Sequence, residues 1–330
     1  MSEVRAKKAL GQHFLVDLNI ARKICDALSG GERPGAGAET RANAAGYAGA
    51  GAEARTMAAG SADAGAETRN GDGAGMAADA RLAADTTAAG APAAAEEERG
   101  GAVPCDVLEV GCGMGVLTQF LLRRSDIVTW GAEIDPESVA YLHAHYPEFA
   151  PRLVAGDFLG MNLRERFPEG LKIIGNFPYN ISSQIFFKVL ENRDLVPECV
   201  GMIQKEVAVR LAEPPGSKEY GILSVLLQAW YDIEYLFTVN ETVFNPPPKV
   251  KSAVIRLRRN ATERLGCDET LFVKVVKASF GQRRKMIRNS LRSVFGNFGG
   301  AEHPFFTQRA EQLSVADFVE LTDWVAANRT

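Results

Sequence analysis

Cysteine is scarce in this sequence, and long apolar runs are missing altogether. The cysteines at positions 25, 105, 112, 199 and 267 form no CxxC pair and no cluster with histidine. This spacing argues against both a zinc site and a secreted disulfide framework. The N-terminus, MSEVRAKKALGQHF, lacks the apolar core of a signal peptide, and no stretch approaches the roughly 18 apolar residues that cross a bilayer. We therefore expect a cytoplasmic protein without a metal site or a membrane partner.

The net charge of −4 is distributed unevenly along the chain. Residues 30–101 hold 11 acidic and 6 basic side chains and so carry −5. Residues 249–292, by contrast, hold 13 Lys and Arg against 3 Asp and Glu. Such a concentration of positive charge is what a phosphate-contacting surface needs, so the overall acidity does not exclude a nucleic-acid partner.

Residues 30–101 are also poor in the side chains that build a core. Leu82 is the only Leu, Ile, Val, Phe or Trp among them, and Ala and Gly make up more than half. An AGAETR-like unit recurs about every 14 residues, but solenoid repeats need apolar side chains to bury between neighbours. Because burial cannot offset the entropy of ordering, we expect a largely disordered insertion. A partner-binding arm is the alternative.

Strand and helix patterns alternate through the rest of the chain. Residues 16–28 predict a short amphipathic helix, with Asp17 as its N-cap. Strand-like runs are expected at 106–110, 127–135, 152–157, 171–179, 235–244 and 252–259, and helical runs at 116–122, 136–146, 182–192 and 222–233. Further helices are expected at 271–280, 283–295 and 314–328. This order is typical of an α/β fold with a doubly wound, mostly parallel sheet, followed by a small C-terminal helical domain.

A glycine turn and two acidic residues follow the first three strand-like runs after the insertion. The turn reads Glu109-Val110-Gly111-Cys112-Gly113-Met114-Gly115, a GxGxG pattern rather than the GxGxxG of dinucleotide-binding folds. Glu133, about 20 residues later, could accept both ribose hydroxyls of a nucleoside, and Asp157 could accept from an adenine amino group. Each feature alone fits an ordinary turn or a solvated strand end. Together, at three successive strand ends, they predict a nucleoside cofactor pocket.

The fourth of these strands ends in Asn176-Phe177-Pro178-Tyr179. An exocyclic adenine amine is a poor nucleophile because its lone pair is delocalised into the ring. Hydrogen-bond acceptors that draw the amine toward a tetrahedral geometry would overcome this, and Asn176 with a backbone carbonyl beside Pro178 supplies them. Tyr179 supplies a surface on which the base can stack. The alternative is a turn in which proline only rigidifies the chain and tyrosine only packs.

The sequence resembles the small-subunit ribosomal RNA adenine dimethyltransferases of the KsgA/RsmA type, everywhere except in the insertion. The motifs that carry the resemblance are GQHFL, LEVGCGMGVLT, AEID, AGDF, GNFPYNISS, MIQKEVAVRL, YGILSV, FNPPPKVKSAVIRL and FGQRRKMIRNSL. It implies a Rossmann-like class I methyltransferase domain and S-adenosylmethionine as cofactor. The implied cofactor-binding positions are His13, Leu15, Gly111, Glu133, Asp157 and Asn176. His13 replaces a common Asn and Phe177 a common Leu, and an aromatic ring at position 177 could narrow the pocket.

The resemblance also implies the substrate, two adjacent adenosines in the 3′-terminal hairpin of 16S rRNA, each dimethylated on N6. We expect an N-terminal segment with the first helix (1–29), the insertion (30–101), the catalytic domain (102–260) and a helical RNA-binding domain (261–330). RNA phosphates would be contacted by Lys249, Lys251, Arg283, Arg284, Lys285 and Arg288, the 283–285 cluster lying on a helix. A monomer is expected. The alternatives are a 23S rRNA dimethyltransferase of the macrolide-resistance type and a non-catalytic RNA-binding assembly factor.

Overall fold

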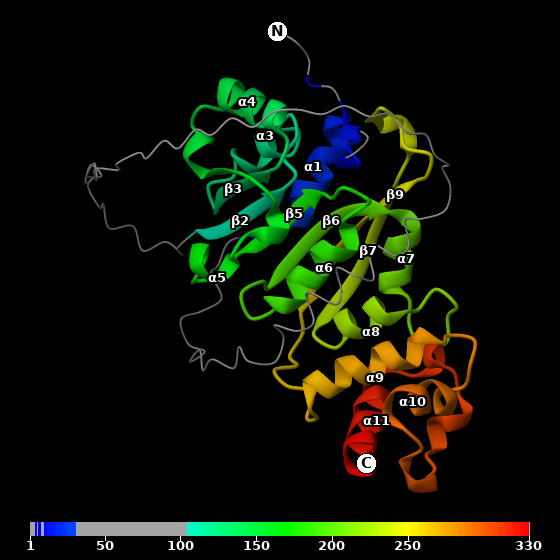
Figure 1. Ribbon diagram of the computed structural model, residues 1–330. Helices are drawn as coiled ribbons and strands as arrows, with labels where there is room; N and C mark the ends of the chain where they lie inside the picture. The colour runs from blue at the N-terminus through cyan, green and yellow to red at the C-terminus, as the bar shows by residue number, and fades with distance from the viewer. Residues whose placement is uncertain (1–3, 5, 8–9, 31–103, 330) are drawn as a thin grey trace, which may run out of the picture.

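The computed structural model describes residues 4, 6–7, 10–30 and 104–329, so the expected insertion lies outside the described residues except for Gly30. An α/β part forms most of what is described, and three helices of the C-terminal part lie together at one end of it (Figure 1). This arrangement agrees with the α/β class predicted from the alternating pattern.

The central sheet has seven strands in the order β4-β3-β2-β5-β6-β9-β7. Strands β4, β3, β2, β5 and β6 are parallel, whereas β9 and β7 pair antiparallel at one side. The strands are β2 (Cys105–Val110), β3 (Ile127–Glu133), β4 (Leu153–Ala155), β5 (Lys172–Asn176), β6 (Glu198–Gln204), β7 (Tyr231–Val239) and β9 (Ser252–Arg259). A separate two-stranded pair joins β1 (Phe14–Leu15) to β8 (Phe244–Asn245).

Helices cover both faces of this sheet. Neighbouring residues on a strand point to opposite faces, so Val107 and Ile174 join one buried cluster while Leu108 and Ile173 join another. The first cluster includes residues of α1 (Leu18–Ala27) and α3 (Thr118–Leu121). The remaining helices of this part are α4 (Pro136–His145), α5 (Leu163–Arg166), α6 (Ser182–Glu191), α7 (Lys205–Ala212) and α8 (Ile222–Gln228).

The C-terminal helices share a core with the sheet. They are α9 (Glu269–Gly281), α10 (Ile287–Phe295) and α11 (Val315–Asn328). Phe272 of α9 meets the fully buried Trp230 edge to face, with ring centroids 6.1 Å apart. The same buried cluster runs from Ile173 of the sheet to Phe318 of α11. This continuity fixes the C-terminal helices against the α/β part.

Two helix boundaries differ from those expected. The helix expected at 222–233 ends at Gln228, and Tyr231 begins β7, where its hydroxyl donates to Val196 O at 2.9 Å. The helix expected at 283–295 begins only at Ile287. The prediction that the 283–285 cluster lies on a helix was therefore wrong, and those residues form a turn between α9 and α10. The first helix was predicted correctly, since Asp17 accepts from the backbone N–H groups of Asn19 and Ile20.

Candidate active site

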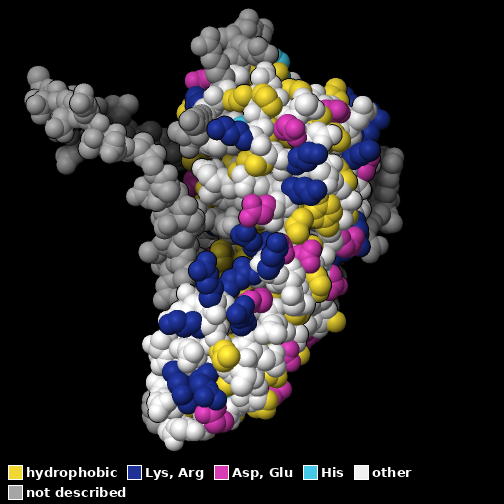
Figure 2. Space-filling view, turned by 90° about the vertical axis from the view of Figure 1, so that its right-hand side faces the viewer, with side chains coloured by type: hydrophobic (Ala, Val, Ile, Leu, Met, Phe, Trp, Pro, Cys, Tyr) yellow, Lys and Arg dark blue, Asp and Glu magenta, His cyan; other side chains and the backbone are white. Residues whose placement is uncertain are grey.

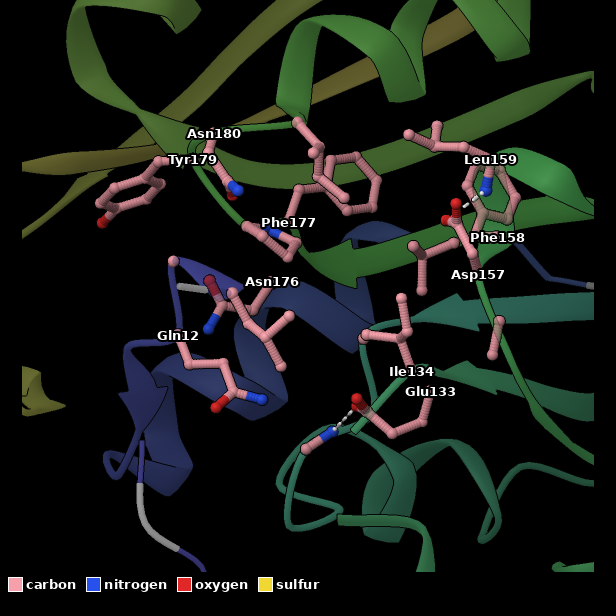
Figure 3. A pocket seen from close by; sticks show the side chains of 18 of the residues that line it. Gln12, Glu133, Ile134, Asp157, Phe158, Leu159, Asn176, Phe177, Tyr179 and Asn180 are labelled. Carbon is pink, nitrogen blue, oxygen red and sulfur yellow. Dashed lines mark hydrogen bonds between the residues drawn. The ribbon is translucent and has the colours of Figure 1, made fainter. Parts of the chain in front are cut away.

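The carboxyl ends of β2, β3, β4 and β5 surround a cavity, and residues 10–14, up to the start of β1, line it from another side. Figure 3 shows side chains from these separate strands pointing into one space, among them Glu133, Asp157 and Asn176. The cavity is lined by residues of the segments 10–14, 110–113, 132–134, 156–159 and 176–181. The features predicted at four successive strand ends are therefore brought together.

The glycine turn has a backbone that other residues would strain. Gly111, Gly113 and Gly115 have φ values of 76°, 53° and 78°, in the left-handed region that favours glycine. A Cβ on Gly115 would also lie only 2.5 Å from the ring of Tyr146. Gly111 and Gly113 line the cavity, so the turn presents backbone without side chains to it.

Glu133 is fixed at the end of β3 by two backbone donors. Its Oε2 accepts from Gly113 N at 2.8 Å, and its Oε1 accepts from Asp135 N at 2.8 Å. The side chain is only 4% exposed, and this burial raises the pKa of its carboxyl above the ordinary value. Each oxygen keeps a lone pair, so the carboxylate can still accept a pair of hydroxyl groups at the cavity.

Glu109 precedes the turn but does not line the cavity. It is buried, and its Oε2 accepts from Thr118 Oγ1 at 2.6 Å. Burial raises the pKa of Glu109 to about 8. This bond links the end of β2 to the start of α3 across the glycine turn, so Glu109 stabilises the turn from within the core.

Asp157 follows β4 and lines the cavity on the same side as Glu133, away from Asn176 and Tyr179 (Figure 3). Its Oδ1 accepts from Leu159 N at 2.9 Å and so caps a short 3-10 helix, while the side chain remains exposed to the cavity. Ile134, which is 51% exposed, and Phe158 provide apolar surface beside it. A flat base with a polar edge would match this combination (Figure 3).

Asn176 is oriented by a backbone carbonyl. Its Nδ2 donates to His13 O at 3.0 Å. Because a carbonyl can only accept, the amide nitrogen must face His13, and Oδ1 is then left as an acceptor on the other side. The carbonyl of Pro178, two residues on, accepts from Ile181 N at 3.2 Å and retains a second lone pair.

Tyr179 and Phe177 have different surroundings. The Tyr179 hydroxyl hydrogen-bonds Ser252 Oγ at 2.5 Å, and burial raises the pKa of Tyr179 above its ordinary value. Phe177 is fully buried, and its ring packs against Phe186 with centroids 5.9 Å apart. Most of the Phe177 ring thus occupies the core beneath the loop, so it takes little room from the cavity.

The two N-terminal positions predicted to bind the cofactor are placed differently from each other. His13 lines the cavity; its Nδ1 lies 2.9 Å from Pro246 O, and its ring lies 5.4 Å from that of Tyr179. The Leu15 side chain is 2% exposed and packs in the core, outside the cavity lining. Its backbone pairs with Phe244 in the β1–β8 strand pair, so the structure does not bring Leu15 to the cavity.

The predicted RNA-binding residues divide into exposed and engaged groups. Those exposed are Lys249, Lys251, Arg284 and Lys285. Arg283 donates to the backbone carbonyls of Lys218 and Tyr220, and Arg288 pairs with Glu302 at 2.7 Å. Figure 2 shows Lys and Arg side chains gathered along one face, from the C-terminal part up to the α/β part.

Contacts connect this basic face to the cavity. Lys205 N, at the start of α7, donates to Lys251 O at 2.9 Å, and the next residue, Ser252, holds Tyr179. The loop that carries Lys249 begins beside His13, whose ring contacts Pro246. Anions on this face would therefore lie next to the catalytic loop.

The sequence assigns no role to Gln12 and Asp135, and it places Lys7 only among the basic residues considered for RNA contact. Gln12 Nε2 lies 3.3 Å and Lys7 Nζ 2.5 Å from the carboxylate of Asp135. Gln12 and Asp135 stand inside the GQHFL and AEID motifs, so their motifs were visible, but their pairing across more than 120 residues was not.

Comparison with solved structures defines the class of fold. A dimethyladenosine transferase from Plasmodium falciparum matches with a TM-score of 0.56 and 24% identity, over 68% of this chain and 90% of that one. The chain has the Rossmann-like fold of class I methyltransferases. Among the described residues, none of the helices is long and apolar enough to cross a membrane.

Sequence comparison defines the family. Residues 104–327 match the family model described as ribosomal RNA adenine dimethylase. The ribosomal RNA small subunit methyltransferase A of Bacteroides thetaiotaomicron is 59% identical over 221 residues, which cover 66% of this chain and 82% of that protein. The protein of the same name from Porphyromonas gingivalis is 46% identical over 325 residues, 98% of each chain. This chain belongs to the ribosomal RNA adenine dimethylase family.

Proposed function

We propose that this protein is a 16S rRNA (adenine-N6,N6)-dimethyltransferase, which dimethylates two adjacent adenosines in the 3′-terminal hairpin of the small-subunit RNA. The observation that carries the proposal is the orientation of Asn176. Its amide nitrogen is held by the His13 carbonyl, so Oδ1 is set as an acceptor at the cavity. An acceptor fixed in this way suits an amine that must be desolvated and reshaped before it reacts.

The catalytic loop can prepare the amine for methyl transfer without a strong base. Asn176 Oδ1 and the Pro178 carbonyl would each accept one N–H of the amine, which turns the nitrogen lone pair out of conjugation with the ring. Tyr179, held by Ser252, would provide a stacking surface for the base. Pro178 limits the freedom of the loop, so both acceptors keep their positions while the base enters.

The opposite half of the cavity fits S-adenosylmethionine. Glu133 offers a buried carboxylate for the ribose hydroxyls, and Asp157 beside Ile134 offers an acceptor and apolar surface for the adenine. Gly111 lines the cavity and has no side chain, which permits close approach of the ligand to the backbone. When bound, this cofactor supplies a methyl group on a positively charged sulfur.

The exposed basic residues are assigned to RNA phosphates within the small ribosomal subunit. Lys249 and Lys251, on the loop beside His13, would contact the RNA backbone closest to the target adenosine, and Arg284 with Lys285 would contact it further away. Arg283 and Arg288 are expected to contribute less to RNA binding, because both already bind other groups of the protein. The proposed role is in small-subunit biogenesis in the cytoplasm, with the protein acting as a monomer.

Radiolabelled methyl transfer to isolated ribosomal subunits tests this function. Small subunits that lack the modification should accept close to four methyl groups each, two on each adenosine. Large subunits should accept none. Label in the large subunit would favour a 23S rRNA enzyme, and RNA binding without transfer would favour an assembly factor.

A further inference from the structure

The segment Leu10–Phe14 lines the cavity and contacts residues of both its halves. On the cofactor side, the ring of Phe14 lies 3.2 Å from where a Cβ on Gly113 would be. On the catalytic side, the His13 carbonyl accepts from Asn176 Nδ2. The position of this segment therefore decides which way the Asn176 amide faces.

Asp135 holds the segment from the cofactor side. Its side chain is fully buried, and Oδ1 accepts from Lys7 Nζ at 2.5 Å while Oδ2 accepts from Gln12 Nε2 at 3.3 Å. Lys7 N donates to Gln12 Oε1 at 2.8 Å, so the three residues form a closed set of bonds. Burial alone would raise the pKa of Asp135, but hydrogen bonds from Lys7 and Gln12 outweigh it and lower this pKa.

Asp135 is also bonded to the proposed ribose-binding residue. Its backbone N–H donates to Glu133 Oε1 at 2.8 Å. One residue thus joins the end of β3, where the cofactor is proposed to lie, to the segment that orients Asn176. The Lys7 side chain is 36% exposed and also pairs with Glu137 at 3.0 Å, but the Asp135 carboxylate is buried, so losing a partner leaves its charge uncompensated in the interior.

We propose that Asp135, Gln12 and Lys7 are positioning residues for methyl transfer, which act through the His13 carbonyl to fix the amide of Asn176. This inference rests on the proposed function, because it assigns Asn176 to the target amine. If the segment loosens, Asn176 can rotate and its acceptor is no longer aligned with the amine. The loss then appears in the chemical step, because the three residues act through Asn176, which aligns the amine for transfer.

Single-turnover methyl transfer with saturating cofactor and small subunits tests the proposal in Lys7→Met and Gln12→Leu. Both variants should lose roughly tenfold or more in rate, while their affinity for S-adenosylmethionine changes by less than about threefold. Gln12→Leu changes no charge, so its loss cannot come from weaker attraction to RNA. Lys23→Met, which removes an exposed lysine on α1, should behave as the wild type.

The Asn176→Asp background tests whether the effect passes through Asn176. Aspartate cannot donate to the His13 carbonyl, so adding Gln12→Leu to it should cost much less than in the wild type. The proposal is overturned if the single variants transfer methyl groups at the wild-type rate, or if Gln12→Leu lowers the rate as much in the Asn176→Asp background as in the wild type. It is also overturned if each loss of rate is matched by an equal loss of cofactor affinity.

Hydrogen exchange supplies a readout that does not depend on activity. Backbone amides of residues 10–15 should exchange faster in Lys7→Met and Gln12→Leu than in Lys23→Met. Unchanged exchange would overturn the inference even if the enzyme is active. If the wild-type protein transfers no methyl group, the proposed function is overturned instead. Faster exchange in Lys7→Met and Gln12→Leu would then still support the role of the three residues in holding the segment.

Discussion

Gly201 lies in the middle of β6, and because it has no side chain the ring of Phe177 can pack against its backbone. A Cβ on Gly201 would overlap Phe177 Cε2 and lie 2.8 Å from Cδ2. Gly175, which pairs with Gly201 in the sheet, lies against the same ring, and Phe186 packs edge to face against it with ring centroids 5.9 Å apart. We predict that Gly201→Ala displaces Phe177 and, with it, the adjoining Asn176.

The magnitude follows from the cost of overpacking a dense core. One added methyl group that forces side chains and backbone to shift costs about 1–3 kcal/mol. In a protein of this size each kcal/mol lowers the melting temperature by about 2–4 °C, so a drop of roughly 4–8 °C is expected at the middle of that range. A displacement of Asn176 by about 1 Å should lower the methyl-transfer rate by up to roughly 100-fold.

Phe177→Leu provides the matched test, since the shorter side chain makes room for the added methyl group. Alone it should cost about 1 kcal/mol through the lost burial and the space left behind. Combined with Gly201→Ala, it should restore part of both the melting temperature and the rate, measured by thermal unfolding and single-turnover transfer. Simple addition of the two losses, or a neutral Gly201→Ala, would refute the reasoning.

Three further predictions concern the cofactor site, a buried carboxyl and the insertion. Glu133→Ala should weaken S-adenosylmethionine binding by about 10-fold or more in calorimetry, and unchanged affinity would remove Glu133 from the site. The pKa of Glu109 is about 8 in the folded protein and 4.5 when the side chain is exposed. Between these pH values the folded protein keeps a proton on Glu109 that the unfolded chain releases, so the free energy of unfolding falls as the pH rises. The stability of Glu109→Gln relative to the wild type, measured in urea, should therefore increase from pH 5 to pH 8; a constant difference would contradict this. Joining Ser29 to Ala102 through a short linker removes a segment that carries −5. The melting temperature and the methylation rate should stay nearly unchanged, and RNA affinity at low salt should stay equal or rise. Lost activity would contradict the expectation that residues 30–101 are a largely disordered insertion.

The arrangement of the candidate site could be predicted because parallel strands bring their carboxyl ends to one edge. A glycine turn, an acidic residue and an Asn-x-Pro-Tyr loop at successive strand ends therefore had to meet. Glu133, Asp157 and Asn176 all line the same cavity, as expected. Local signals were equally reliable where one residue determines the structure, as at Asp17, which caps α1.

Features that depend on distant contacts could not be predicted. Arg283 leaves the helical pattern because it binds the carbonyls of Lys218 and Tyr220, more than 60 residues earlier. The helix expected to continue to residue 233 stops because Tyr231 pairs with Arg259 in the sheet. Asp135 and Lys7 are 128 residues apart, and nothing in their local sequence indicates the pairing.

The central claim is that Asn176 sets the target amine for methylation. Mass spectrometry of nucleosides from unmodified small subunits, incubated with protein and S-adenosylmethionine, tests it most directly. N6,N6-dimethyladenosine should form with the wild type and be absent with Asn176→Ala, while RNA binding and the melting temperature of the variant stay close to wild type. Dimethyladenosine produced by Asn176→Ala at the wild-type rate, or none produced by the wild type, would contradict the claim.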